Sequence, residues 1–169
     1  PGLSTDGWFS LTGAASGSLR RPVLTSMLHA DTWRVGDFLL EEANLPFTLS
    51  GDTLLLTQGS ARGYGGELAL TGRVDDVYSR RVYTLAGNMT GVALEDLPLV
   101  EDLGQDIAGV VSLPQITVWG SRDSKPRSAV TFRVDGGRVG SEELQPITGR
   151  AQFLGDLLRV DATKIRRAD

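Results

Sequence analysis

The chain repeats one phrase, in which a short run of alternating apolar residues is followed by a glycine and a second such run. Clear copies lie at residues 49–56 and 65–74, and variants follow at residues 134–139, 147–151 and 153–158. Glycine readily adopts the positive φ angles of tight turns and bulges, so each phrase predicts two adjacent antiparallel strands. Joined end to end, the phrases predict an all-β fold built on one long meandering antiparallel sheet.

Composition supports this expectation and excludes several function classes. The 169 residues predict a single domain, residues 1–169. The 21 glycines are about twice the average usage, which favours many turns and few helices. The net charge of −4 argues against a nucleic-acid partner. There is no cysteine for disulfides or thiolate metal sites, and no apolar run approaches the roughly 18 residues of a membrane-spanning helix.

Strands are expected at residues 8–15, 23–30, 32–35, 38–43, 45–49, 54–57, 60–64, 67–74, 82–90, 107–113, 116–119, 128–135, 150–154 and 157–162. Because this pattern begins and ends without a boundary, we expect the chain to be an interior piece of a longer protein. Pro114 interrupts one apolar run and predicts a bulge or an edge position.

One stretch departs from the strand pattern. Its apolar residues recur every three positions, at Leu94, Leu97, Val100 and Leu103. This spacing favours a helical turn over a strand. Asp96 can cap such a turn and Pro98 suits its first positions. We therefore predict one short helix near residues 97–103.

Alternation places apolar residues on one face of the sheet and polar residues such as Thr48, Glu67 and Thr71 on the other. Such a sheet normally covers its apolar face with helices or a second sheet, yet the sequence offers only one short helix and no second set of strands with a distinct pattern. We therefore expect the sheet to curl into a half-pipe or a closed fold with an apolar concave face. With strands about 4.8 Å apart, a dozen strands make a trough about 50 Å or more long. The predicted lining consists of Phe47, Leu49, Leu54, Leu56, Leu68, Leu70, Val111, Leu113, Val130, Phe132, Val134 and Phe153.

Two motifs carry a resemblance to a known family. Residues 17–24 read Gly-Ser-Leu-Arg-Arg-Pro-Val-Leu, and residues 64–72 read Tyr-Gly-Gly-Glu-Leu-Ala-Leu-Thr-Gly, with Leu54-Leu55-Leu56 and Gly59 between them. They resemble the repeating units of the TamB family (translocation and assembly module subunit), which is related to AsmA-like proteins. Those units carry a Gly-Ser-Leu-x-x-Pro step and a Gly-Gly-x-Leu-x-Leu-x-Gly step. The similarity extends loosely from Gly7 to Val160.

The resemblance implies a taco-shaped or tube-like β-groove with its apolar face inside. Members are anchored in the inner membrane and span the periplasm of double-membraned bacteria. They are proposed to carry phospholipid between the membranes, or to assist outer-membrane protein assembly with a β-barrel partner of the TamA or BamA type. The implied cargo is phospholipid acyl chains or unfolded outer-membrane protein strands. The family brings no catalytic residues and no cofactor, and the short helix is not one of its signatures.

The sequence holds few residues that suit catalysis or metal binding. His29 is the only histidine, which excludes most histidine metal sites. Acidic pairs occur at residues 41–42, 75–76, 95–96 and 101–102. Adjacent carboxylates on a strand point to opposite faces and do not chelate a cation by themselves. No catalytic or metal site is predicted.

Two alternatives remain open at this stage. One is a structural or adhesive β-solenoid segment with a sealed core. The other is a carbohydrate-binding β-sandwich that uses Trp8, Trp33 and Trp119.

Overall fold

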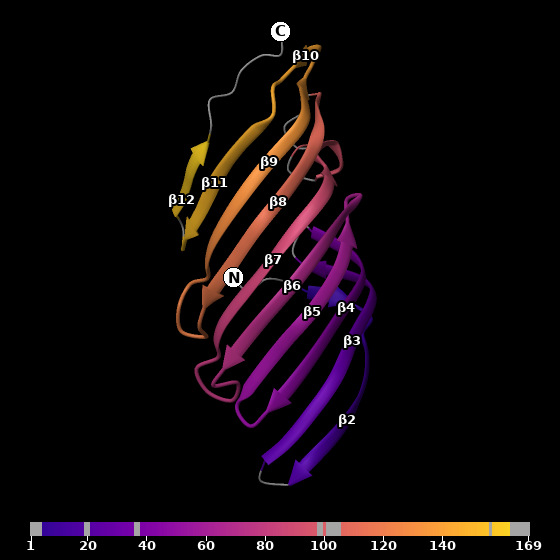
Figure 1. Ribbon diagram of the computed structural model, residues 1–169, viewed down its shortest axis with the longest axis vertical. Coiled ribbons are helices and arrows are strands. Elements are labelled where there is room, and N and C mark those ends of the chain that lie inside the picture. Colours follow the sequence, from indigo (N-terminus) through magenta and orange to yellow (C-terminus); the bar gives the residue numbers. More distant parts are fainter. Residues whose placement is uncertain are drawn as a thin grey trace.

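The computed structural model describes residues 5–18, 21–35, 38–97, 100, 106–155 and 157–162. Within these residues, twelve strands form one antiparallel sheet, so the predicted all-β class is confirmed (Figure 1). The strands are β1 (Thr5–Gly7), β2 (Ser10–Ser18), β3 (Arg21–Val35), β4 (Phe38–Ser50), β5 (Thr53–Gly63), β6 (Gly66–Asp75), β7 (Val82–Ala93), β8 (Ile107–Gly120), β9 (Arg127–Val139), β10 (Glu142–Glu143), β11 (Ile147–Leu154) and β12 (Leu157–Ala162).

The sheet is a meander in which neighbours in sequence are neighbours in space. Its order is β1-β3-β4-β5-β6-β7-β8-β9-β11-β12, while β2 also pairs with β3 and β10 also pairs with β9. Figure 1 shows the strands side by side from the indigo β2 to the yellow β12. The two ends of the sheet do not meet, so it is a curled sheet and not a closed barrel. All described strands belong to this one sheet, so the sandwich form of the carbohydrate-binding alternative is wrong.

The strands are longer than the sequence pattern predicts. Residues 23–30 and 32–35 belong to one strand, β3, and residues 54–57 and 60–64 are joined in β5 up to Gly63. The apolar alternation is interrupted because the pairing shifts register at β-bulges, for example between Leu56 and Gly59 of β5. Pro114 lies at such a shift within β8, between Ser112 and Gln115, as the prediction of a bulge requires.

The glycines therefore divide into two groups. Gly51 has a φ of +61° and forms the turn between β4 and β5, as predicted. Gly72 and Gly149 instead lie inside β6 and β11 and continue the backbone ladder. Copies of the repeated phrase thus mark turns at Gly51 and Gly155, whereas the copies at residues 134–139 and 147–151 lie within single strands, β9 and β11, so the prediction of two strands is wrong for them.

A 3-10 turn, η1 (Leu94–Asp96), follows β7 and has no side-chain cap. The N–H of Leu97 donates to the carbonyl oxygen of Leu94 at 3.1 Å. Apart from Leu97 and Val100, the predicted helix near residues 97–103 lies outside the described residues. In the described part of the chain, no helix has the length and apolar character needed to cross a bilayer.

The sheet has almost no sealed interior. Among the described residues, only Ala30, Ala43, Ala61 and Val92 are buried apolar side chains. The three alanines form a cluster against which Trp33, Leu40 and Leu68 pack as partly buried residues. No large side chain described in the structure is fully buried. Most apolar surface of this sheet is therefore only half covered.

Candidate functional site

Cross-strand register shows which side chains share the apolar face. Residues directly opposite each other on neighbouring strands point to the same side of a sheet. One row runs across five strands, through Phe47, Leu56, Gly72, Leu85 and Val118. The row extends the apolar surface across the middle of the sheet without a charged residue.

Two further rows run beside it. The first passes through Gly59, Leu70, Gly87, Ile116 and Val130, and the second through Ala61, Leu68, Met89 and Leu113. The register and the alternation along each strand put the twelve predicted lining residues on one face: Phe47, Leu49, Leu54, Leu56, Leu68, Leu70, Val111, Leu113, Val130, Phe132, Val134 and Phe153. We call this surface the apolar face.

The apolar face is larger than the sequence pattern indicates. It also contains Val74, Leu85, Met89, Val92, Ile116, Val118 and Ile147, which the sequence reasoning missed. Leu85 and Met89 alternate around Gly87, and this spacing was a usable signal. The glycine hides this alternation because it has no apolar side chain of its own.

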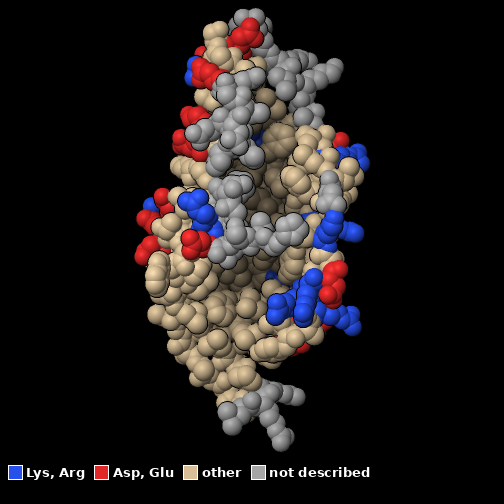
Figure 2. Space-filling view, turned by 180° about the vertical axis from the view of Figure 1, so that it is seen from behind, with Lys and Arg blue, Asp and Glu red and all other residues tan. Residues whose placement is uncertain are grey.

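This face is hollowed. Figure 2 views the molecule from the side opposite to Figure 1 and shows a hollow with a mainly tan lining and charged residues along its margins. The other face carries exposed charges in the middle of its strands, such as Arg62, Glu67 and Arg73. The hollowed, uncharged surface is therefore the apolar face.

Exposure along each strand supports the same assignment. In β6, Leu68, Leu70 and Val74 are half-buried, whereas Glu67 and Thr71 between and beside them are exposed. Phe153 stands apart from the other lining residues because it is 45% exposed near the β12 end of the sheet. No side chain or segment among the described residues covers the apolar face as a second layer would.

The polar face carries a repeated ion pair. An Arg-Val-Asp tripeptide occurs at residues 73–75, 133–135 and 159–161, and each places its arginine beside its aspartate. Arg133 donates to both carboxylate oxygens of Asp135, at 2.6 and 2.7 Å. These hydrogen bonds lower the pKa of Asp135 below its ordinary value. The valine of each tripeptide faces the apolar side, so the motif fits the two faces of the sheet.

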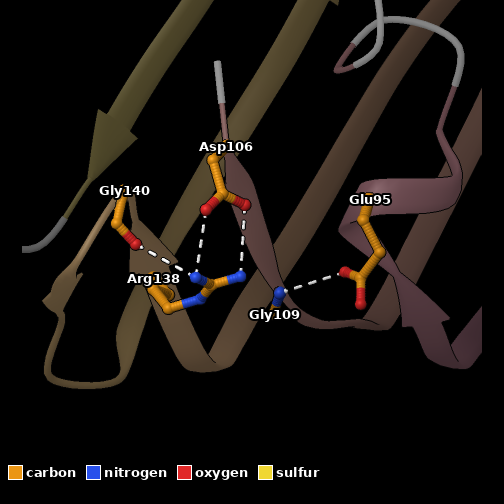
Figure 3. Close-up of polar contacts among 5 residues, drawn as sticks. All are labelled: Glu95, Asp106, Gly109, Arg138 and Gly140. Atoms are coloured by element: carbon orange, nitrogen blue, oxygen red, sulfur yellow. Dashed lines mark hydrogen bonds and ion pairs between the residues drawn. The ribbon is translucent and has the colours of Figure 1, made fainter.

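A second polar cluster, drawn in Figure 3, fastens the connection between β7 and β8. Arg138 of β9 donates to both oxygens of Asp106 at 3.0 and 3.1 Å, and to the carbonyl of Gly140 at 3.1 Å. Glu95 of η1 accepts a hydrogen bond from the N–H of Gly109 at 3.2 Å. Hydrogen bonds from its own backbone N–H and from that of Gly109 lower the pKa of Glu95. Because these hydrogen-bond donors already have acceptors within the cluster, we assign the cluster a structural role, which is to hold the connection between β7 and β8 in place.

His29 lies on the polar face beside Asn44. Its Nδ1 is 2.9 Å from Asn44 Oδ1, and its Nε2 is 3.1 Å from Asp31 Oδ1. Within the described ranges, no group of three or more histidine, aspartate or glutamate side chains is arranged to hold a metal ion. The polar face therefore offers ion pairs and hydrogen bonds within the sheet.

No family model, curated protein or solved structure matches the chain. The apolar face is therefore the feature from which a function is inferred.

Proposed function

We propose that the chain is a non-enzymatic hydrophobic-groove module of a TamB- or AsmA-like protein that bridges the inner and outer membranes of a double-membraned bacterium. Its role would be phospholipid transport, outer-membrane protein assembly, or both. The observation that carries this proposal is the hollowed apolar face, which crosses the sheet from β3 to β12 and which no second layer of described residues covers.

The energetics of the apolar face favour an apolar cargo. Transferring an acyl chain out of water returns about 0.8 kcal/mol for each methylene that becomes buried. The half-buried lining residues Leu56, Leu70 and Ile116 would lose their remaining exposure beneath such a chain. A bound apolar cargo would therefore bury the apolar surface that the sheet leaves exposed.

The distribution of polarity favours sliding over tight capture. The central rows hold aliphatic side chains and glycines, such as Leu70, Gly87 and Ile116, with no charged group to fix a headgroup. Charges lie at the margins of the hollow, where a lipid headgroup would remain in water (Figure 2). The ten-strand path spans nine spacings, or about 43 Å along the sheet. This length accommodates acyl chains or an extended polypeptide strand.

The edges of the sheet suit a module that continues into neighbouring segments. At the β12 edge, Leu157, Leu158 and Val160 are 62%, 52% and 51% exposed. An unpaired edge with apolar side chains is prone to pair with another strand. Further strands of a parent protein would pair with this edge and extend the groove towards a β-barrel partner of the TamA or BamA type.

The sealed-core alternative fits less well. A solenoid core would enclose its large apolar side chains, whereas Leu68 and Leu70 are only half-buried and three of the four buried apolar residues described are alanines.

The proposal is tested by photocrosslinking in cells that make the full-length protein. A photoreactive residue is placed at Phe132 on the apolar face, and a matched one at Gln152, an exposed position on the polar face of the nearby strand β11. We expect the Phe132 probe to capture phospholipid or outer-membrane protein and the Gln152 probe to capture neither. Equal capture at both positions, or none at Phe132, would refute the proposal.

A further inference from the structure

Trp8 is the most exposed large apolar side chain described, at 92% of its full surface. It lies in the short break between β1 and β2, outside the backbone ladder. The next residue behaves differently, because Phe9 packs edge-on against Trp33 with ring centres 5.9 Å apart. The contact anchors the chain beside Trp8 and leaves the indole of Trp8 free. A large aromatic side chain exposed to this extent is a feature of binding surfaces.

Trp8 borders a second hollow, of about 450 Å³, which differs from the hollow of the apolar face. Its other principal lining residues are Leu39 and four polar side chains, Asp6, Asp31, Thr32 and Arg34. Three strands contribute, because Asp6 of β1 lies directly opposite Arg34 of β3, which lies opposite Leu39 of β4.

This hollow is separate from the apolar face. Trp33 and Leu40, opposite each other on β3 and β4, pack against the buried alanine cluster. Their neighbours Arg34 and Leu39 therefore point to the other side of the sheet. A ligand in the hollow would not touch the groove lining.

The charged side chains of the hollow have hydrogen-bonding capacity left for a ligand. Within the part of the chain that the structure describes, Asp6 and Arg34 form no ion pair, although they are cross-strand neighbours. Asp31 is 93% exposed and accepts a hydrogen bond from His29 through one oxygen, Oδ1. Carboxylates accept hydrogen bonds and a guanidinium donates several in one plane.

We infer that this hollow binds a neutral saccharide, with one pyranose ring stacked on the indole of Trp8. A pyranose has a face of C–H groups that suits an aromatic ring, and hydroxyls at its edge that suit Asp6, Asp31 and Arg34. Two carboxylates against one guanidinium make the hollow slightly anionic, which disfavours acidic polymers and anionic lipid surfaces. The other two tryptophans are less suitable, since the Nε1 of Trp33 is buried and Trp119 is half-buried.

The test is an NMR titration of the whole chain with cellotriose and with tri-N-acetylchitotriose, following the three indole N–H signals. We expect the Trp8 signal to shift and the other two to move little. Trp8→Ala should weaken binding about tenfold or more, which corresponds to loss of the stacked contact. Asp31→Asn should weaken it severalfold. Because Trp8 is almost fully exposed, its removal leaves the sheet intact, which circular dichroism would verify.

Two controls separate this site from the groove. Trp119→Phe should leave saccharide binding unchanged, as should Leu68→Arg on the apolar face. The inference is overturned if neither trisaccharide shifts the Trp8 signal at about 10 mM, a concentration about ten times the Kd of a weak, millimolar ligand. A Trp8 shift produced by anionic phosphatidylglycerol vesicles and by neither sugar would also overturn it. Loss of sugar binding in Leu68→Arg alone would assign the site to the groove instead.

Discussion

The side chain of Leu70 on β6 lies across Gly87 on β7. If Gly87 carried a Cβ atom, it would stand 2.8 Å from Leu70 Cδ2 and would also overlap the carbonyl oxygen of Ala69. Leu85 lies across Gly72 in the same way, in the opposite direction between the same two strands. Leucines of one strand thus occupy the space above glycines of the next. This packing keeps the apolar face smooth and explains glycines that form no turn.

Replacing Gly87 by alanine should destabilise the sheet by about 1–3 kcal/mol, in the range of overpacked cores. The new methyl group meets the backbone of β6, and the backbone cannot move aside without breaking the ladder. Urea denaturation followed by circular dichroism measures the free energy of unfolding. Gly72→Ala is the matched comparison and should cost less, because its nearest neighbour is the flexible end of Leu85. Equal stability of Gly87→Ala and the wild type would contradict this packing account.

The pKa of His29 should lie above its ordinary value of about 6.5. The hydrogen bond to Asn44 is the main cause, followed by that to Asp31, because both acceptors favour a ring that carries two protons. The folded-state pKa is raised, so this group's contribution to stability is present below about pH 6.5 and is lost as the pH rises through the folded pKa.

Since His29 is the only histidine, one NMR titration reports its pKa without ambiguity. Asn44→Ala should lower that pKa, and Asp31→Asn should lower it by less. A wild-type pKa at or below the ordinary value would show that these hydrogen bonds do not form in solution.

The pKa of Asp135 should lie below its ordinary value because Arg133 donates to both of its oxygens. A depressed folded-state pKa means that the contribution to stability is present above about pH 3.9 and is lost as the pH falls through the folded pKa. Arg133→Gln should return the Asp135 pKa towards the ordinary value in a carbon-detected NMR titration. Arg150→Gln, on the same face of β11, serves as the control and should leave it unchanged. A shift of equal size in both variants would indicate a general charge effect.

The fold class was predictable from the sequence because period-two alternation is a direct consequence of strand geometry. Leu68, Leu70, Val130 and Phe132 alternate with small or polar residues, so their common face could be assigned without coordinates. The absence of a second patterned set of strands also predicted that no separate sheet covers this face, and the described strands do form one sheet.

The extent of that face could not be predicted in the same way. Bulges at Gly59 and near Pro114 change which residues share a side, and single-sequence alternation does not reveal register. The hollow at Trp8 joins residues of β1, β3 and β4, and only the pairing of Asp6 with Arg34 and of Arg34 with Leu39 brings them together. These are properties of pairing between distant segments, which a sequence pattern does not encode locally.

The most direct test of the apolar groove is the binding of a fluorescent phospholipid analogue to the purified chain, comparing Leu68→Arg with Ala69→Arg. These adjacent residues of β6 point to opposite faces, so both variants add the same charge and only one places it in the groove. We expect Leu68→Arg to lose binding while remaining folded, because the groove is open, and Ala69→Arg to bind like the wild type. Equal binding by both variants, or no saturable binding by the wild type, would contradict an open lipid-accessible groove.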